Sequence, residues 1–442
     1  MTKLQLPSNS KMLDKSFTYG VATASFQIEG GKEHRLDCIW DTFCNTDGKI
    51  ADSSNGEVAC DHYNLWQDDV ALIDSLGVDA YRLSISWPRV MLQDGTLNQD
   101  GVDYYLNIIN ALNDRNIKVY VTLYHWDLPQ YLEDTGGWLN RQTAYAFAHY
   151  VDLISKAFKG KVHSYATLNE PFCSSYLGYE IGVHAPGIVG KEYGRKSAHH
   201  LLLAHGLAMQ VLKENTPETM NGIVLNFTPC YPASNSEADL YATDFADQYF
   251  NQWYIKPIFD KCYPDIIKDL PTEHQPDIQS GDMEIIAQSI DFLGINFYTR
   301  AIYKAHPDDI YEQLPAPAPL TDIGWEIYPK AFSELLVSLD SKYQLPPVYI
   351  TENGAAMDDS IDQGVVNDDD RLSYYQQHLN AVNDAIEQGV DIQGYFAWSL
   401  MDNFEWAEGY LKRFGIVYVD YETQKRTIKK SGLAYKELIS NR

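Results

Sequence analysis

The stretch Val348-Tyr349-Ile350-Thr351-Glu352-Asn353-Gly354 is a short run of apolar and β-branched residues that ends in a single glutamate. An earlier run, Tyr165-Ala166-Thr167-Leu168-Asn169-Glu170-Pro171, ends in the same way. A carboxylate is costly to take out of water, so a glutamate at the end of a buried strand has either a task or a partner. Each run therefore predicts a buried strand that delivers a carboxyl group to one edge of a sheet.

Apolar runs of this kind recur along the whole chain. They occupy residues 19–24, 80–85, 119–124, 165–168, 223–227, 292–297, 348–351 and 395–400. Continuous apolar strands, in contrast to alternating ones, indicate a parallel sheet that is covered on both faces. The segments between them carry apolar residues at three- and four-residue steps, as Val102, Tyr105, Ile109 and Leu112 do, which predicts helices. Eight strands that alternate with helices predict an α/β fold, a (β/α)₈ TIM barrel with elaborated βα loops.

The length of 442 residues corresponds to about three average domains, but barrels of this type run past 400 residues as one unit. No linker, low-complexity tract or internal repeat divides the sequence. The proline-rich residues 314–320 are predicted to form a surface loop in the sixth connection. We therefore expect residues 1–442 to form a single domain.

The charge balance restricts the partners. A net charge of −27 argues against nucleic acid or an anionic membrane surface, because both would repel the protein, and it fits a neutral substrate. No stretch reaches the roughly 18 uninterrupted apolar residues of a membrane span, and the first 14 residues lack the apolar run of a signal peptide. Six scattered cysteines look like free thiols. We expect a cytoplasmic protein, as a monomer or a homo-oligomer.

Polar and aromatic residues stand at or just beyond the ends of five of the predicted strands. They are His125, Trp126, Asn169, Glu170, Asn296, Tyr298, Glu352 and Trp398. In a barrel these strand ends form one rim, which is the active-site face. Two glutamates that meet there are the apparatus of glycoside hydrolysis, in which one carboxyl group protonates the leaving oxygen and the other attacks or activates water. The alternative for each glutamate taken alone is a structural ion pair.

Five motifs in order carry a family resemblance. They are residues 22–30 (ATASFQIEG), residues 124–129 (YHWDLP), the two glutamate motifs and residues 398–406 (WSLMDNFEW). Over essentially its full length the chain resembles the β-glucosidases of glycoside hydrolase family 1. The resemblance implies an exo-acting enzyme that removes terminal non-reducing β-D-glucosyl residues with retention, through a covalent glycosyl-enzyme intermediate. It implies that Glu352 is the nucleophile and that Glu170 is the general acid and base.

The resemblance also implies supporting roles. Arg82, with a hydrogen bond from Tyr298, would keep Glu352 ionised, and Asn296 would orient Glu352 or the sugar 2-hydroxyl. Trp398 would stack under the sugar ring, and Trp325 would form a wall of the aglycone subsite unless it serves packing alone. Cys173 is expected near that subsite without a catalytic role. The residues expected to contact the sugar are Gln27, His125, Trp126, Asn169, Glu405 and Trp406.

The substrates implied are small β-glucosides and cello-oligosaccharides, with β-galactosidase or β-fucosidase activity as a possible addition. A 6-phospho-β-glycosidase is the main alternative, because Lys412-Arg413 is similar to a phosphate-binding pair; the carboxylate of Glu405 would repel a 6-phosphate. A non-catalytic sugar-binding barrel would lack one of the two glutamates, and a thioglucosidase would replace Glu170. No cofactor or metal is expected: the histidines at 199, 200 and 205 match no zinc motif, and no P-loop or dinucleotide fingerprint is present.

Overall fold

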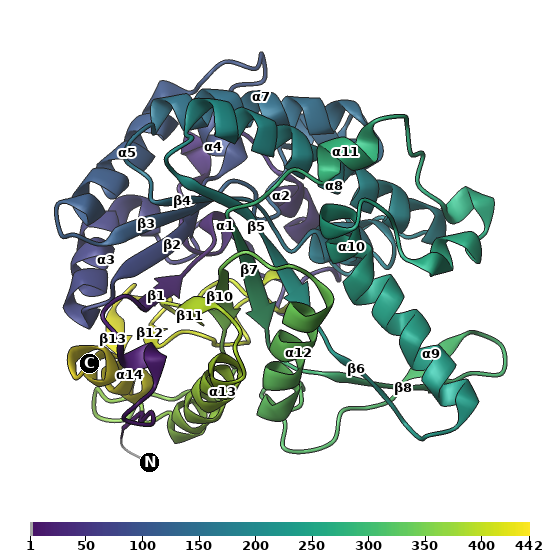
Figure 1. The fold of residues 1–442 in the computed structure, drawn as a ribbon. Coiled ribbons are helices and arrows are strands. Elements are labelled where there is room, and N and C mark those ends of the chain that lie inside the picture. The colour runs from purple at the N-terminus through teal and green to yellow at the C-terminus, as the bar shows by residue number, and fades with distance from the viewer. Residues whose placement is uncertain (1–2) are drawn as a thin grey trace.

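Eight parallel strands close into a barrel in the computed structural model, which describes residues 3–442 (Figure 1). Each strand pairs with its neighbours around the ring, and β1 closes the ring by pairing with both β2 and β11. The strands are β1 (Thr18–Ala22), β2 (Ala80–Ser84), β3 (Lys118–Thr122), β4 (Ser164–Asn169), β5 (Met220–Phe227), β7 (Phe292–Phe297), β10 (Val348–Asn353) and β11 (Ile392–Trp398). The predicted barrel is confirmed, with strand ends that differ from the predicted ones by up to three residues.

Helices surround the barrel (Figure 1). The long ones are α3 (His62–Leu76), α5 (Gln99–Asn113), α7 (Gln142–Ala157), α8 (Lys191–Asn215), α12 (Pro329–Lys342), α13 (Asp369–Glu387) and α14 (Lys430–Ser440). Helix α5 buries Val102, Tyr105, Ile109 and Leu112, as the spacing of these residues predicts. The apolar stripe of each helix covers the outer face of the barrel, which is why the strands lack polar alternation.

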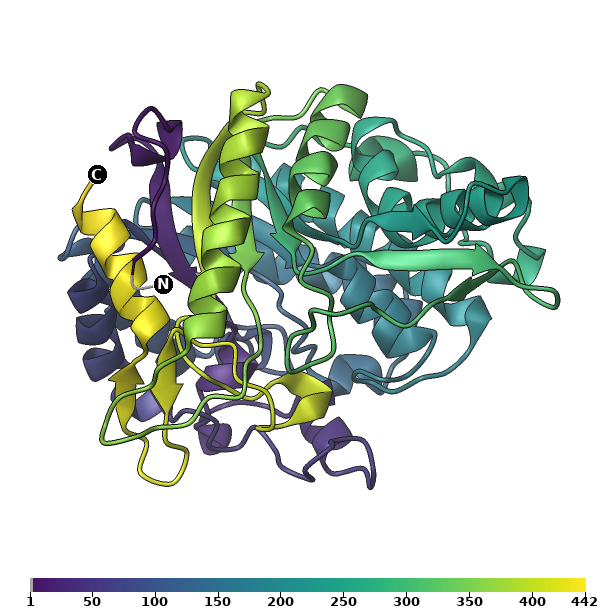
Figure 2. The same cartoon turned by 90° about the horizontal axis from the view of Figure 1, so that it is seen from below.

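Shorter elements fill the βα connections. They are α1 (Ser25–Ile28), α2 (Ile39–Cys44), α4 (Trp87–Val90), α6 (Gln130–Glu133), α9 (Glu237–Asp247), α10 (Trp253–Phe259), α11 (Asp282–Ile286), β12 (Val417–Val419) and β13 (Arg426–Ile428). A separate three-stranded sheet consists of β6 (Cys230–Pro232), β8 (Ala301–Ala305) and β9 (Tyr311–Gln313). With α9 it projects from one side of the barrel (Figures 1 and 2). Residues 314–320 follow β9 in the sixth connection, where the sequence predicts a loop.

A buried ionic network joins three segments next to the barrel rim. The ammonium group of Lys429, which is fully buried, lies 2.6 Å from Asp359 and 2.6 Å from Asp402. Asp359 also binds Arg371, and Asp402 also binds Arg413. Asp359 lies in the connection after β10, Asp402 lies in the loop after β11, and Lys429 immediately precedes α14. Removing one member would leave an uncompensated buried charge, which costs about 3–5 kcal/mol in buried pairs.

All six cysteines are free thiols. Within residues 3–442, no helix is both long enough and apolar enough to cross a bilayer.

Candidate active site

The carboxyl-terminal ends of the strands bring the predicted site residues to one rim of the barrel. Glu170 directly follows β4, and Glu352 is the second-last residue of β10. Asn296 lies in β7, beside Glu352 in the sheet register. Trp126 and Glu170 have left-handed backbones, with φ of 78° and 46°. Non-glycine residues in this region carry strain of about 1–3 kcal/mol, which persists only where the surroundings hold it. The packing around Trp126 and Glu170 therefore holds both residues in this backbone conformation.

The carboxylate of Glu352 is held by a cation and a phenol. Nη1 of Arg82 donates to its Oε1 at 2.6 Å, and the hydroxyl of Tyr298 donates to its Oε2 at 2.6 Å. Nη1 of Arg82 also reaches the carbonyl of Thr351. Glu352 is only 3% exposed, so these charge-assisted bonds act in a low-dielectric surrounding. They stabilise the ionised form of this carboxyl group.

Glu170 has neutral partners. Nδ2 of Asn296 donates to its Oε1 at 2.6 Å, and the thiol of Cys173 donates to its Oε2 at 3.0 Å. The side chain is 5% exposed. Within the described part of the chain, no lysine, arginine or histidine forms an ion pair with Glu170. The two buried carboxyl groups therefore differ in kind: one binds a guanidinium group directly and the other does not.

The pKa values follow from this difference. Burial raises the pKa of Glu170, and the charge of Glu352 raises it further. Burial also raises the pKa of Glu352, but Arg82 and Tyr298 lower it. Because two like charges in one buried site repel, the pair retains one proton. Arg82 places the negative charge on Glu352, which leaves the proton on Glu170.

Asn169 and His125 are joined by a hydrogen bond, and His125 and Gln27 each have a buried polar atom without a partner among residues 3–442. Oδ1 of Asn169 accepts from Arg82 at 2.7 Å, so its Nδ2 donates to Nε2 of His125 at 3.1 Å. This bond places the ring proton of His125 on Nδ1, a buried atom without a partner among residues 3–442. Burial holds the pKa of His125 well below its usual range, so the ring is neutral. Oε1 of Gln27 is likewise buried and unpartnered.

An aromatic cluster lies beside these polar groups. The ring of His125 lies 5.8 Å from that of Trp398 and 5.9 Å from that of Trp406, with interplanar angles of 21°. Trp126 lies 4.5 Å from Trp406, and its indole N–H is bound to the carbonyl of Asn169. The structure thus brings together an apolar ring surface and the unused donor and acceptor of His125 and Gln27.

Glu405 reaches the same site. Its nearest polar partner is Nε2 of Gln27 at 3.5 Å, so its oxygens have free acceptor capacity. Burial, followed by the charge of Glu352, raises its pKa to about 8. The side chain is nevertheless partly accessible to water, and solvent reduces such a shift.

Trp325 and the pair Lys412 and Arg413 lie at the mouth of the barrel. Trp325 is half-buried and lies 5.3 Å from the ring of Tyr298, which places it beside the partner of Glu352. Lys412 and Arg413 are engaged elsewhere. Lys412 binds the side chain and the carbonyl of Asp322, and Arg413 binds Asp402. This basic pair therefore supports the loops at the mouth of the barrel.

Several contributors were not assigned from the sequence. Trp40 lies 4.6 Å from Trp406, and His184 packs on Trp40 and Trp126. Nε2 of Gln27 is fixed by Oδ1 of Asn403. Asn403 belongs to one of the family motifs, which is the only signal that points to it. Trp40 lies in α2 and His184 in the connection after β4, and the sequence pattern does not predict how these connections fold back over the rim.

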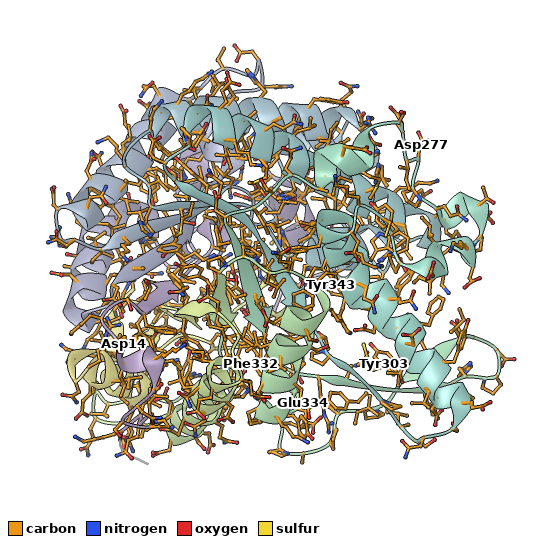
Figure 3. The ribbon with its side chains drawn as sticks, in the orientation of Figure 1. Asp14, Asp277, Tyr303, Phe332, Glu334 and Tyr343 are labelled. Atoms are coloured by element: carbon orange, nitrogen blue, oxygen red, sulfur yellow. The ribbon has the colours of Figure 1, made fainter. Side chains whose placement is uncertain are left out.

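Other candidate sites carry no such arrangement. Within residues 3–442, no group of three or more His, Cys, Asp or Glu side chains is placed to hold a metal ion. His199, His200 and His205 bind Asp282, the carbonyl of Trp138 and Thr167 respectively. A cavity of about 250 Å³ lies outside the barrel beside α12, where Glu334 and Tyr343 line it (Figure 3). Its carboxylates are satisfied: Glu334 accepts from Tyr231, and Asp247 accepts from two amides.

The chain is similar to known proteins over nearly its whole length. The model of the family described as glycosyl hydrolase family 1 matches residues 9–442. A β-glucosidase of Agrobacterium sp. is 45% identical over 433 residues, which cover 96% of this chain and 94% of that protein. A bifunctional β-D-glucosidase/β-D-fucosidase of Bifidobacterium breve is 41% identical, covering 97% and 98%. The structure of a Thermotoga maritima family 1 glycoside hydrolase, complexed with a cyclophellitol analogue transition state mimic, aligns with a TM-score of 0.95 at 43% identity, covering 98% and 99%.

Proposed function

The chain belongs to glycosyl hydrolase family 1, and from this premise we propose that Glu352 is the nucleophile and Glu170 the acid and base of a retaining β-glucosidase. Family membership and full-length identity of 40–45% to β-glucosidases give the reaction class. The assignment of the two roles is supported by one observation: Glu352 binds Arg82 and Tyr298, whereas Glu170 has only neutral donors.

The reaction takes two steps. Ionised Glu352 attacks C1 of the glucoside while Glu170 gives its proton to the departing oxygen, which leaves an ester between Glu352 and the sugar. The ester carries no charge, so the pKa of Glu170 falls and this carboxylate accepts a proton from water. The water oxygen attacks C1, Glu352 is released as a carboxylate, and Glu170 is protonated again. The sugar leaves in the β configuration in which it arrived.

The unused polar atoms support recognition of a neutral sugar. Nδ1–H of His125 offers a donor, Oε1 of Gln27 offers an acceptor, and Glu405 offers acceptor oxygens. Hydroxyl groups both donate and accept, so a glucosyl ring satisfies all three while its apolar face lies on Trp398. Oδ1 of Asn169 is bound by Arg82 and one hydrogen of its Nδ2 by His125, so the second hydrogen of Nδ2 is the donor left for the 2-hydroxyl. We further propose cello-oligosaccharides as substrates.

The setting of the enzyme is also part of the proposal. The family match over residues 9–442 supports one catalytic domain. Six free cysteines support a reducing compartment such as the cytoplasm, and the net charge of −27 disfavours nucleic acid as a partner.

Tyr298→Phe will shift the acidic limb of the pH profile. The lost hydroxyl favours ionised Glu352, so its removal raises the pKa of that group. The nucleophile is lost as pH falls through this pKa, so the acidic limb of kcat/KM moves to higher pH, by about one unit. The measurement is kcat/KM for 4-nitrophenyl β-glucoside from about pH 4 to about pH 9, the range in which Glu352 and Glu170 are expected to titrate. An unmoved or downward-shifted acidic limb would contradict the role of Tyr298.

The enzyme is expected to prefer 4-nitrophenyl β-glucoside over its 6-phosphate by about 100-fold or more in kcat/KM. A second negative charge beside Glu405 costs several kcal/mol, and Lys412 and Arg413 are bound elsewhere. Glu405→Gln removes the repulsion, so the ratio of kcat/KM for the glucoside to kcat/KM for its 6-phosphate should become smaller. Activity of this variant on the neutral glucoside should fall. Preference of the wild type for the phosphate would refute this specificity.

A further inference from the structure

The two oxygens of Glu170 face different chemistry. Oε1 accepts from Nδ2 of Asn296, and Oε2 accepts from Sγ of Cys173 at 3.0 Å. Cys173 begins a π-helical turn, Cys173–Leu177, and its backbone N–H donates to the carbonyl of Glu170 at 2.9 Å. This backbone bond keeps Cys173 next to the carboxyl group, and the residue is only 7% exposed.

The amide of Asn296 determines which oxygen carries the proton. Oδ1 of Asn296 accepts from the hydroxyl of Thr351 at 2.7 Å, and this bond turns Nδ2 toward Glu170. An amide nitrogen only donates, so Oε1 must act as an acceptor whether Glu170 is ionised or protonated. The proton of the acid form therefore resides on Oε2. A thiol can donate to an ionised Oε2 and accept from a protonated one, which an amide cannot do.

We propose that Cys173 is a positioning residue whose thiol holds Oε2 of Glu170, and that Oε2 is the oxygen through which the proton is transferred. This inference rests on the proposed acid and base role of Glu170. In the first step the Oε2–H bond breaks, its proton goes to the departing oxygen, and the thiol becomes a donor to the ionised Oε2. In the second step Oε2 takes a proton from water and the thiol returns to accepting.

Among residues 3–442, the thiol of Cys173 is the side-chain group that donates to Oε2 of Glu170. The titratable groups that face Glu170, besides Cys173, are Glu352 from β10, Arg82 from β2, Tyr298 just after β7, and Glu405. Tyr254 from α10 faces Cys173. The guanidinium group of Arg82 donates to Glu352, Thr351, Asn169 and Thr122 and not to Glu170. Burial raises the pKa of the Cys173 thiol well above its usual range, and Glu170 raises it further, so the thiol keeps its proton and remains a donor.

The test is the pH dependence of kcat/KM for phenyl β-glucoside, whose poor leaving group needs the acid. Cys173→Ala removes a donor to ionised Glu170, which raises the pKa of Glu170. Activity is lost as pH rises through this pKa, so the alkaline limb should move up by about 0.5–1 pH unit. Cys173→Ser restores a donor and acceptor and should return the limb to the wild-type position or below.

Two controls keep the outcome decisive. Cys38→Ala, at another buried cysteine, should leave the limb in place. Cys173→Val, which lacks a donor but fills the space, replaces the alanine variant if that variant unfolds. The proposal is overturned if the alkaline limb of Cys173→Ala and of Cys173→Val stays within about 0.2 pH unit of the wild type. It is also overturned if Cys173→Ser shifts the limb as far as Cys173→Ala does.

Glu170→Gln separates this inference from the assignment beneath it. If Glu170 is the acid, the glutamine variant loses the alkaline limb altogether. If the limb persists in that variant, the role of Glu170 is wrong and the proposed function fails first. If the limb disappears but Cys173→Ala leaves the wild-type profile unchanged, only the inference on Cys173 fails.

Discussion

Glu352→Ala will lower kcat for 4-nitrophenyl β-glucoside by about 10⁴-fold or more, since loss of an attacking nucleophile costs up to about 10⁶ in comparable enzymes. Without this carboxylate no ester forms at C1, and the positive charge that develops on the sugar in the transition state has no counter-charge. The change leaves Arg82 without one of its partners, so the variant is expected to fold but to be less stable.

The measurement is steady-state hydrolysis, combined with mass spectrometry of the wild type after incubation with a slow 2-fluoro-glucoside. The expected result is one added glycosyl group on the peptide that carries Glu352. Circular dichroism of the variant controls for unfolding. Hydrolysis at the wild-type rate, or a label on a different peptide, would remove Glu352 from its role.

Glu170→Gln will separate substrates by their leaving groups. General acid catalysis contributes about 10²–10⁴-fold, so kcat/KM for phenyl β-glucoside should fall by that factor. 2,4-Dinitrophenyl β-glucoside departs without a proton, so its kcat/KM should change little. Its kcat should still fall, because no base activates water in the second step and the intermediate accumulates.

Glutamine is the matched replacement here, because it keeps the size of Glu170 and an acceptor for Asn296. Addition of azide, which attacks the intermediate without a base, should restore kcat for the dinitrophenyl substrate and yield the β-glucosyl azide. Equal loss of kcat/KM on both substrates would show that Glu170 acts on binding or folding and not on proton transfer.

The barrel and its two glutamates were accessible from the sequence because each depends on local pattern. An apolar run flanked by helical periodicity is visible in the chain itself, and a carboxyl group at its end stands out by its cost of burial. The eight predicted strands follow the observed ones, including β4 and β10, which carry the pair.

What the sequence did not predict depends on contacts between distant segments. The hydroxyl of Thr351 donates to Asn296 and orients its amide, and the thiol of Cys173 donates to the carboxyl group of Glu170. A threonine or a cysteine in the sequence does not by itself predict such a bond. The position of Trp40 against Trp406 depends on the path of two long loops. The β6–β8–β9 sheet was also not predicted, because its strands are only three to five residues long and lie in the connections that follow β5 and β7.

The single ammonium group of Lys429 ties the final helix to the loop that ends at Glu405 and Trp406. Because Asp402 and Asp359 both bind that one buried atom, a substitution that displaces the start of α14 would also disturb the segment that leads to Glu405 and Trp406. Selection for heat tolerance or for a new glycone can therefore act on a helix that no substrate touches.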